Sequence, residues 1–429
     1  MKMRVLRHLL VWMTVVVLTG PLARPAAAQE APRALTLAAL VATADERNPT
    51  VTAARRGVEA ADAGVRLAKA GLAITVSAQG SAGIVGGTTT SSSSLSSSAG
   101  VSASYTLYDS GQTAASVRQA EANLRSAQAT LNQVRQDTSV AAAQAYVTLL
   151  RAQRAVDQTQ QVVAQNQGLL RLAEAQFQAG VVARADVVRA QANLAAAEGN
   201  LIAARNGVDQ ATAGLNTAIG QGPTVAITAA SAPAVPQATV AQADLARLVE
   251  ERPEVRKALS DIDAATAAVA VVQANAGLQL SLTSGVTQGL TPTGQTVYSI
   301  GTTVNFPLVD GGRSSAQVAQ AQANLAAAQA RIENTRLTLQ LQAVTALSSI
   351  VSARARITSA QAGLAFAQEA LRLSQGRYAA GAATILEVID AQTALVQAQV
   401  TLDNAQFDEL AGVVSLRYAL GRSVVDGTI

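Results

Sequence analysis

The sequence predicts a mostly helical fold with a small β part, built from two copies of one structural unit. Two tracts without proline, 50–222 and 308–429, are rich in alanine and glutamine, a composition that favours very long helices. Shorter segments in each half alternate apolar and polar residues with a period of two, as strands do. The motif "YDSGQ" at 108–112 returns as "VDGGR" at 309–313, a spacing of 201 residues that holds from this motif onward. The chain therefore contains an internal duplication.

The first 28 residues have the pattern of a cleaved secretory signal. Basic residues precede the apolar run "LLVWMTVVVL", and the segment ends in small residues at Ala26 and Ala28. We expect the mature chain to begin near Gln29. The signal holds four of the 32 lysines and arginines, which leaves 28 against 28 acidic residues. A neutral mature protein gives no indication of a nucleic-acid partner.

Residue types that support most catalysis are missing from the mature chain. The chain has no cysteine, and its single histidine, His8, lies in the signal. We therefore expect no enzyme activity, no metal site, no cofactor, no disulfide and no cysteine-linked lipid anchor. After the signal no stretch approaches twenty apolar residues, so a membrane-spanning helix is not expected, whereas membrane-spanning strands are compatible with the pattern.

The first copy is expected to occupy residues 29–220. Its elements are two strands at about 73–85 and 101–108, a long helix 111–179, a tip at 180–184 and a returning helix to 219. The connector "GGTTTSSSSLSSSAG" at 86–100 is polar and flexible in composition, so it is interpreted as an exposed loop rather than a modification tract.

Apolar residues recur by sevens along the long helix of this copy, with one shift of four. This pattern predicts a coiled coil that is locally unwound. The residues are Val117, Leu124, Leu131, Leu149, Val156, Val163, Leu170 and Phe177.

The second copy is expected at 249–421, after a linker at 221–248 and before a short tail at 422–429. Its elements are strands at about 278–288 and 296–307, a long helix 312–380, a tip at 381–385 and a returning helix to 420. Gly180 and Gly381 supply the glycine that commonly ends a helix, and Thr384 with Glu387 has the spacing of a capping box. Each tip is therefore interpreted as the turn of an antiparallel helical hairpin.

The four strands are long enough to cross a bilayer. Each alternating run has about the nine to eleven residues that a tilted transmembrane strand needs. Half of a soluble sandwich is the alternative. Four strands leave two open edges, and the smallest closed membrane barrels have about eight strands, so within a membrane the chain must combine strands with copies of itself.

The order of these elements resembles the TolC family of outer membrane efflux and type I secretion channels. The resemblance rests on the duplicated order of strand pair, long helix, glycine tip and returning helix, and on "FPLVDGGR" at 306–313. It implies a homotrimer in which each protomer gives four strands to a twelve-stranded transmembrane β-barrel, continuous with a long α-helical barrel. The linker 221–248 would be equatorial.

The same resemblance implies location, partners and function. The channel would sit in the outer membrane of a Gram-negative bacterium, in contact with its lipid, and extend into the periplasm. It would act as the passive exit duct of a tripartite efflux pump or type I secretion system, recruited by a periplasmic adaptor and an inner membrane pump. It would open at its periplasmic helix tips.

The resemblance also implies functional residues, which are assigned by their positions in the shared motifs. The resemblance implies that four residues form the pore constriction or gate: Asp186, Tyr378, Glu387 and Asp390. Tyr378 would form a hydrogen bond across the tip. Ala383 stands where the family pattern has a locking arginine, so Arg184 or Arg377 is expected to supply a tip salt bridge instead. The alternative is that the acids only complement the N-termini of their helices.

Two other classes of protein share some of these features. A periplasmic adaptor is also exported and has a helical hairpin, but a single one flanked by β domains. A filamentous coiled-coil protein also uses long helices without cysteine, but the signal and the strand pairs disfavour it.

Overall fold

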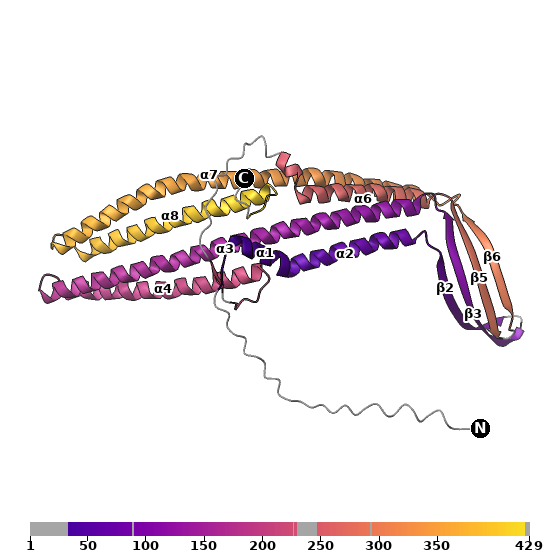
Figure 1. The fold of residues 1–429 in the computed structure, drawn as a ribbon, viewed down its shortest axis with the longest axis horizontal. Coiled ribbons are helices and arrows are strands. Elements are labelled where there is room, and N and C mark those ends of the chain that lie inside the picture. Colours follow the sequence, from indigo (N-terminus) through magenta and orange to yellow (C-terminus); the bar gives the residue numbers. More distant parts are fainter. Residues whose placement is uncertain (1–32, 88–89, 226, 230–246, 292–293, 425–429) are drawn as a thin grey trace, which may run out of the picture.

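The computed structural model describes residues 33–87, 90–225, 227–229, 247–291 and 294–424. The expected signal at 1–28, most of the linker and the end of the tail lie outside the described residues. Figure 1 shows an elongated molecule with strands at one end and two helical hairpin tips at the other.

The long helices form two matched pairs. Helices α3 (Gln112–Gln178) and α7 (Arg313–Ala379) have 67 residues each, which corresponds to about 100 Å at 1.5 Å per residue. The returning helices α4 (Arg184–Ala218) and α8 (Ile385–Ala419) have 35 residues each. Adding 201 to either bound of α3 or α4 gives the corresponding bound of α7 or α8. The predicted duplication and mostly helical fold are confirmed.

Shorter elements complete the strand-side half and the middle of the molecule. Helices α2 (Pro49–Ala70) and α6 (Pro253–Asn275) each begin at a proline, a residue suited to the first helical turn because it lacks the amide hydrogen that would be unpaired there. Helix α1 (Leu37–Arg47) precedes α2. Strands β1 (Arg33–Leu35) and β4 (Ile227–Ala229) pair in parallel.

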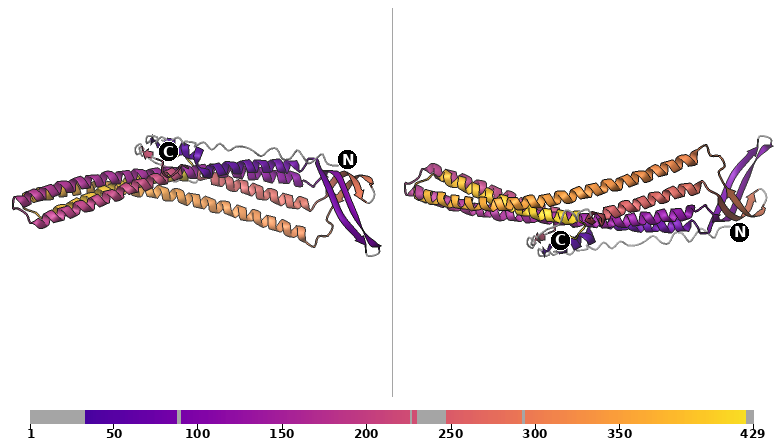
Figure 2. Two further views of the ribbon diagram at one scale, coloured as in Figure 1. Left: turned by 90° about the horizontal axis from the view of Figure 1, so that it is seen from below. Right: turned by 90° about the horizontal axis from the view of Figure 1, so that it is seen from above.

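The helices lie side by side in one curved layer (Figure 2). On the strand side the order of contacting helices is α2, α3, α6, α7, and on the tip side it is α4, α3, α8, α7. Helix α7 therefore forms one edge of the layer along its whole length, while α2 and α4 form the other. None of the described helices is both long and apolar enough to cross a membrane.

The second sheet is a four-stranded antiparallel sheet in the order β2, β3, β5, β6. Its strands are β2 (Thr75–Gly87), β3 (Thr90–Tyr108), β5 (Gln279–Thr291) and β6 (Thr296–Asn305). Strands β2 and β6 are its edges, continuous in sequence with the edge helices α2 and α7. Consequently each edge strand of the sheet is joined in the chain to an edge helix of the helical layer.

The prediction that residues 86–100 form a loop was wrong, because β3 begins at Thr90. Strand β2 continues to Gly87 and supplies backbone partners for the serine tract, with Ser98 opposite Ser81 and Ser96 opposite Gly83. The hydroxyls of Ser81 and Ser98 lie 2.9 Å apart, within hydrogen-bond distance. Pairing along a neighbouring strand thus overrides the loop-like composition.

The seven-residue period of α3 is present, but different residues fill the buried seam on the strand side. Ala115, Ala122 and Ala129 are buried there, whereas the expected Val117 and Leu124 are only half-buried. Alanine allows the neighbouring helices α2 and α6 to approach closely, which places the larger residues beside the seam. Of the expected set Leu149 is fully buried, while Phe177 at the tip is 43% exposed.

Candidate functional site

Both hairpin tips begin with the same backbone turn. Gly180 and Gly381 have φ angles of +73° and +72°, a conformation that favours glycine. At the first tip Val181 N donates to Gln176 O at 2.9 Å and Gly180 N donates to Phe177 O at 3.0 Å. The second tip has the equivalent pair of bonds at Ala382 and Gly381. This is the Schellman arrangement, which satisfies the last carbonyls of each long helix.

The second tip is closed by an ion pair. The Arg377 guanidinium at the end of α7 lies 3.1 Å from the Glu387 carboxylate in the first turn of α8, and it also donates to Ala382 O at 3.3 Å. The capping-box prediction was wrong: Thr384 is the N-cap residue, but its side chain makes no capping hydrogen bond. The carboxylate of Glu387 is directed to Arg377 instead.

Tyr378 lies where the two tips meet, near Asp186. The Tyr378 side chain is buried in a cluster of apolar residues from both hairpins, including Leu169 and Val388. Burial, and then the negative charge of Asp186, raises the pKa of the Tyr378 hydroxyl. That hydroxyl has no hydrogen-bond partner within the described residues. The bond that Tyr378 makes between the tips is through its backbone, whose carbonyl accepts a hydrogen bond from Gln176 Nε2 of the first hairpin at 3.3 Å.

The other expected tip residues lie apart from these pairs. Asp390 and Arg184 are exposed and have no ion-pair partner in the part of the chain that the structure describes. Ala383 is half-buried and packs against the apolar cluster. Of the two arginines considered for a tip salt bridge, Arg377 forms one and Arg184 does not.

A polar seam between α3 and α8 joins the two hairpins. Asp408 on α8 pairs with Arg151 of α3 at 2.8 Å and with Arg356 of α7 at 3.1 Å. Asp403 pairs with Arg154 of α3 at 2.9 Å and accepts a hydrogen bond from Gln158. Nearer the tips Gln392 Nε2 donates to Gln165 Oε1 at 3.1 Å.

Sequence reasoning missed this seam. No local sequence pattern indicates a partner about 250 residues away, which is the separation of Arg151 from Asp408. The available signal was the charge imbalance of α8, which carries five acidic residues and one arginine.

A second polar cluster ties three helices at mid-length. Arg252, at the N-cap of α6, is fully buried, pairs with Glu254 and lies over the ring of Tyr418 in α8 at 4.3 Å. The Tyr418 hydroxyl donates to Asp137 of α3 at 2.6 Å. Burial and this bond raise the pKa of Tyr418 to about 12.

The duplicated "DSG" and "DGG" motifs form the corners between strands and long helices. Asp109 accepts hydrogen bonds from Gly111 N at 3.0 Å and Thr113 N at 2.7 Å, and Asp310 accepts the equivalent bonds from Gly312 N and Ser314 N. Burial by itself would raise the pKa of Asp109, but these hydrogen bonds outweigh it and lower the pKa. The bonds from Ser314 lower the pKa of Asp310 in the same way.

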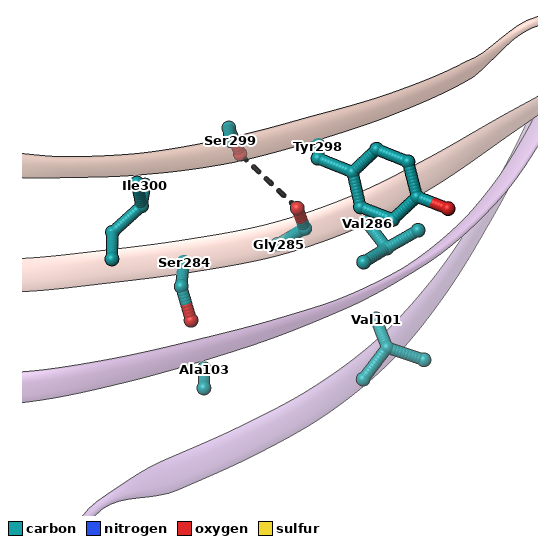
Figure 3. Close-up of a pocket in the computed structure, with 8 residues that line it drawn as sticks. All are labelled: Val101, Ala103, Ser284, Gly285, Val286, Tyr298, Ser299 and Ile300. Carbon is teal, nitrogen blue, oxygen red and sulfur yellow. Dashed lines mark hydrogen bonds between the residues drawn. The ribbon is translucent and has the colours of Figure 1, made fainter.

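The four-stranded sheet has one largely apolar face and one polar face. Figure 3 shows Val101, Val286, Tyr298 and Ile300 on the first face, where they line a shallow hollow. Hydroxyl pairs occupy the other face, with Ser77 and Ser102 at 3.0 Å and Thr75 and Ser104 at 2.6 Å. Every residue of β6 is exposed, because no described helix packs on the sheet.

The four-stranded sheet has two unpaired edges and no helix packed on it, and its strands lead into two copies of a very long helical hairpin. This combination defines a class of protein, the outer membrane channel with an α-helical extension. A family model described as outer membrane efflux protein matches residues 40–221 and 245–422. The chain belongs to this family, and the resemblance seen in the sequence is confirmed.

Solved structures with the same fold are outer membrane proteins. VceC from Vibrio cholerae is 23% identical, with a TM-score of 0.77, and the alignment covers 90% of this chain and 96% of that one. The CmeC outer membrane channel of Campylobacter jejuni is 18% identical, with a TM-score of 0.78 and coverage of 91% and 87%. The MtrE outer membrane channel of Neisseria gonorrhoeae, solved in its open state, is 21% identical, with a TM-score of 0.74 and coverage of 92% and 91%. Among curated proteins no match was found.

Proposed function

We propose that this chain forms a trimeric channel-tunnel of the outer membrane that serves as a passive exit duct and opens at its periplasmic tips. The observation that carries the proposal is that the edges of the sheet coincide with the edges of the helical layer. One edge of the molecule is formed by strand β2 with helices α2 and α4. The opposite edge is formed by strand β6 with helix α7. Copies placed edge to edge would extend the sheet and the helical layer at once.

Closure of the sheet requires more than one copy, and membership of the efflux protein family favours three. Unpaired strand edges cannot remain in a bilayer, and four strands are too few for a closed barrel. Three copies supply twelve strands, which is within the range of membrane barrels, and strand β6 of one copy would pair with β2 of the next.

The edge helices carry complementary apolar residues. At the first tip and along α4 the exposed apolar residues Val181, Val188 and Ile202 are separated by multiples of seven residues. The tip half of α7 exposes Phe366 at 76% and Leu373 at 52%, also seven residues apart. Such stripes are typical of coiled-coil contacts, so α7 of one copy would pack against α4 of its neighbour.

Opening would separate the hairpin tips. Asp186, Tyr378, Glu387 and Asp390 would then form the gate, with Gly180 and Gly381 as its fixed turns. The contacts that hold the two hairpins together in one chain are the α3–α8 seam and the apolar cluster around Tyr378. A hairpin moving outward must break these contacts.

Energy and substrate selection would come from partners. Membership of the efflux protein family supports recruitment by a periplasmic adaptor and an inner membrane pump. Export of small molecules and secretion of whole proteins would use the same duct, without covalent chemistry.

The proposal is tested by extracting the protein from membranes with detergent and measuring its mass and its conductance. We expect a homotrimer that conducts ions in a planar bilayer. A chain released by osmotic shock without detergent, or a trimer without conductance, would contradict the proposal. Replacing Val188 and Ile202 by Asp should reduce trimer formation, whereas Asp at Leu259, which is 47% exposed on the inner helix α6, should not.

A further inference from the structure

The two halves of the chain repeat the register of their strands as well as their elements. Gly80 lies opposite Ala99 in the β2–β3 hairpin, and Ser284 lies opposite Ile300 in the β5–β6 hairpin. The second pair therefore follows the first by 204 residues in the first strand and by 201 residues in the second strand. The offset of 204 also relates the start of α2 to that of α6, and the offset of 201 relates α3 to α7. Each contact in one half thus has matching positions in the other half.

The contact between the two halves has no second occurrence within the described chain. Strand β3 pairs with β5, and helix α3 packs against α6. The matching elements are β6 with β2 and α7 with α2, and these lie at opposite edges of the sheet and of the helical layer. The β3–β5 and α3–α6 interface can therefore recur only between two copies, as a continuation of the interface already present inside each copy.

Three alanines on α7 mark the place where this second interface is missing from the single chain. Their counterparts on α3 are 1%, 0% and 7% exposed, whereas all three on α7 are exposed. The alanines are Ala115, Ala122 and Ala129 on α3, and Ala316, Ala323 and Ala330 on α7. Helix α7 already has α6 beside it, as α3 has α2. The difference in burial therefore comes from the contact of α3 with α6.

Helix α2, at the opposite edge, has the complementary feature. Ala267 and Ala274 of α6 are buried. The matching residues of α2, Ala63 and Ala70, are exposed. Helix α2 already has α3 beside it, as α6 has α7, so the burial on α6 comes from α3. Each edge helix thus exposes the small residues with which α3 and α6 pack inside the chain.

We propose that neighbouring copies meet through a repeat of this internal interface, with α7 and β6 of one copy packed against α2 and β2 of the next. The internal interface fixes the register of the strands. Inside one copy Ser102 lies opposite Gly285, and the matching positions are Thr303 and Ser81. Thr303 of one copy therefore lies opposite Ser81 of the neighbouring copy. This inference rests on the proposed trimer for its partner, but it specifies which residues meet.

The alternation of faces along the strands agrees with this register. It places Ile300 of one copy opposite Ile84 of the next, and these side chains are 80% and 75% exposed in the single chain. Ile84 lies on the same face as Ala78, which pairs with Val101 of the apolar face. A shift of one residue would place Ile84 opposite a residue of the polar face. Shifts of two residues preserve the faces, so the test must separate them from the expected register.

The test introduces pairs of cysteines, because the chain has none of its own. Ser81 and Thr303 lie on opposite edge strands of one sheet, three strand spacings or about 14 Å apart, which is too far for a disulfide within one copy. The full-length double variant Ser81→Cys, Thr303→Cys is extracted in detergent, oxidised and separated on a denaturing gel without reductant. We expect most of the protein as covalent dimers and trimers that a thiol reductant returns to monomers. Ala82→Cys with Thr302→Cys is the adjacent pair and should also crosslink.

The matched controls combine Thr303→Cys with either Gln79→Cys or Gly83→Cys. These positions lie on the same face of β2 as Ser81 but two residues away from it. Diagonal neighbours on paired strands have Cβ atoms about 7 Å apart, beyond the reach of an unstrained disulfide. Crosslinking of both controls should therefore be about fivefold or more below that of the Ser81→Cys, Thr303→Cys variant.

The outcomes separate this register from the proposed function. A trimer that crosslinks best through position 79 or 83, or through none of these pairs, would overturn the register and leave the trimeric channel standing. A protein that is monomeric in detergent would contradict both proposals. Crosslinking at the expected pairs in a trimer that does not conduct would support the interface and refute the duct.

Discussion

Arg377 and Glu387 form an ion pair across the second hairpin tip, with Nη1 and Oε2 3.1 Å apart. The matching positions of the first tip, 201 residues earlier, hold Gln176 and Asp186, which cannot form such a pair. The duplication is therefore asymmetric at the tips, and only the second hairpin has an electrostatic link between its own two helices.

Replacing Arg377 by Gln gives the second tip the residue that the first tip has at the matching position, Gln176. Since both partners are largely exposed, the loss should lower the free energy of unfolding by less than about 1 kcal/mol. We expect opening in planar bilayers to become several-fold more frequent, because Glu387 is released toward the neighbouring tips. Arg118→Gln is the matched control, since Arg118 on the inner helix α3 is exposed and has no ion pair among the described residues. Equal effects of the two variants would remove the ion pair from the gate.

Gly381 is predicted to be costly to replace. Its φ of +72° places an added Cβ in a strained conformation, so Gly381→Ala should reduce stability by about 1–2 kcal/mol. Gly363→Ala should have the opposite effect and raise the free energy of unfolding by up to about 1 kcal/mol, because Gly363 lies within helix α7 and has open space around it. Urea unfolding of the detergent-solubilised protein measures both. A Gly381→Ala protein as stable as the wild type would show that the tip turn tolerates another conformation.

Local sequence patterns predicted the elements well and their long-range partners poorly. Absence of proline and the glycines at 180 and 381 are local signals, and the long helices follow them closely. The repeat at a spacing of 201 residues adds that the two halves share one design. The pairing of Asp408 with Arg151 and Arg356 depends on two helices meeting in space, which no local pattern encodes. At Glu387 the capping-box pattern was present, but a tertiary partner took the carboxylate.

The strand–helix corners predict a dependence of stability on acid. The pKa values of Asp109 and Asp310 are lowered in the folded chain, so their ionised forms stabilise it above the unfolded-state pKa of about 3.9. This stabilisation is lost as the pH falls from there through the lowered pKa values. The double variant Asp109→Asn and Asp310→Asn should lose less stability than the wild type between pH 5 and about pH 2.

Asp157→Asn provides the control for this titration, because Asp157 lies on the inner helix α3, is exposed and is unpaired within the described residues. Its pH profile of thermal unfolding should follow that of the wild type. Identical acid profiles for the double variant and the wild type would exclude the corners as the origin of the acid sensitivity.

Asp408 is predicted to restrain the movement of the two hairpins. Its carboxylate is shared by Arg151 of α3 and Arg356 of α7, and Arg151 also lies over the Phe407 ring at 5.8 Å. Asp408→Asn removes both ion pairs and leaves two guanidinium groups close together, so it should favour separation of α8 from α3. We expect several-fold more frequent opening in planar bilayers and faster protease cleavage near the tips. Asp157→Asn makes the same change of charge at an exposed, unpaired site on α3 and should have neither effect. If Asp408→Asn conducts like the wild type, the seam is structural and the restraint must lie in the apolar cluster around Tyr378.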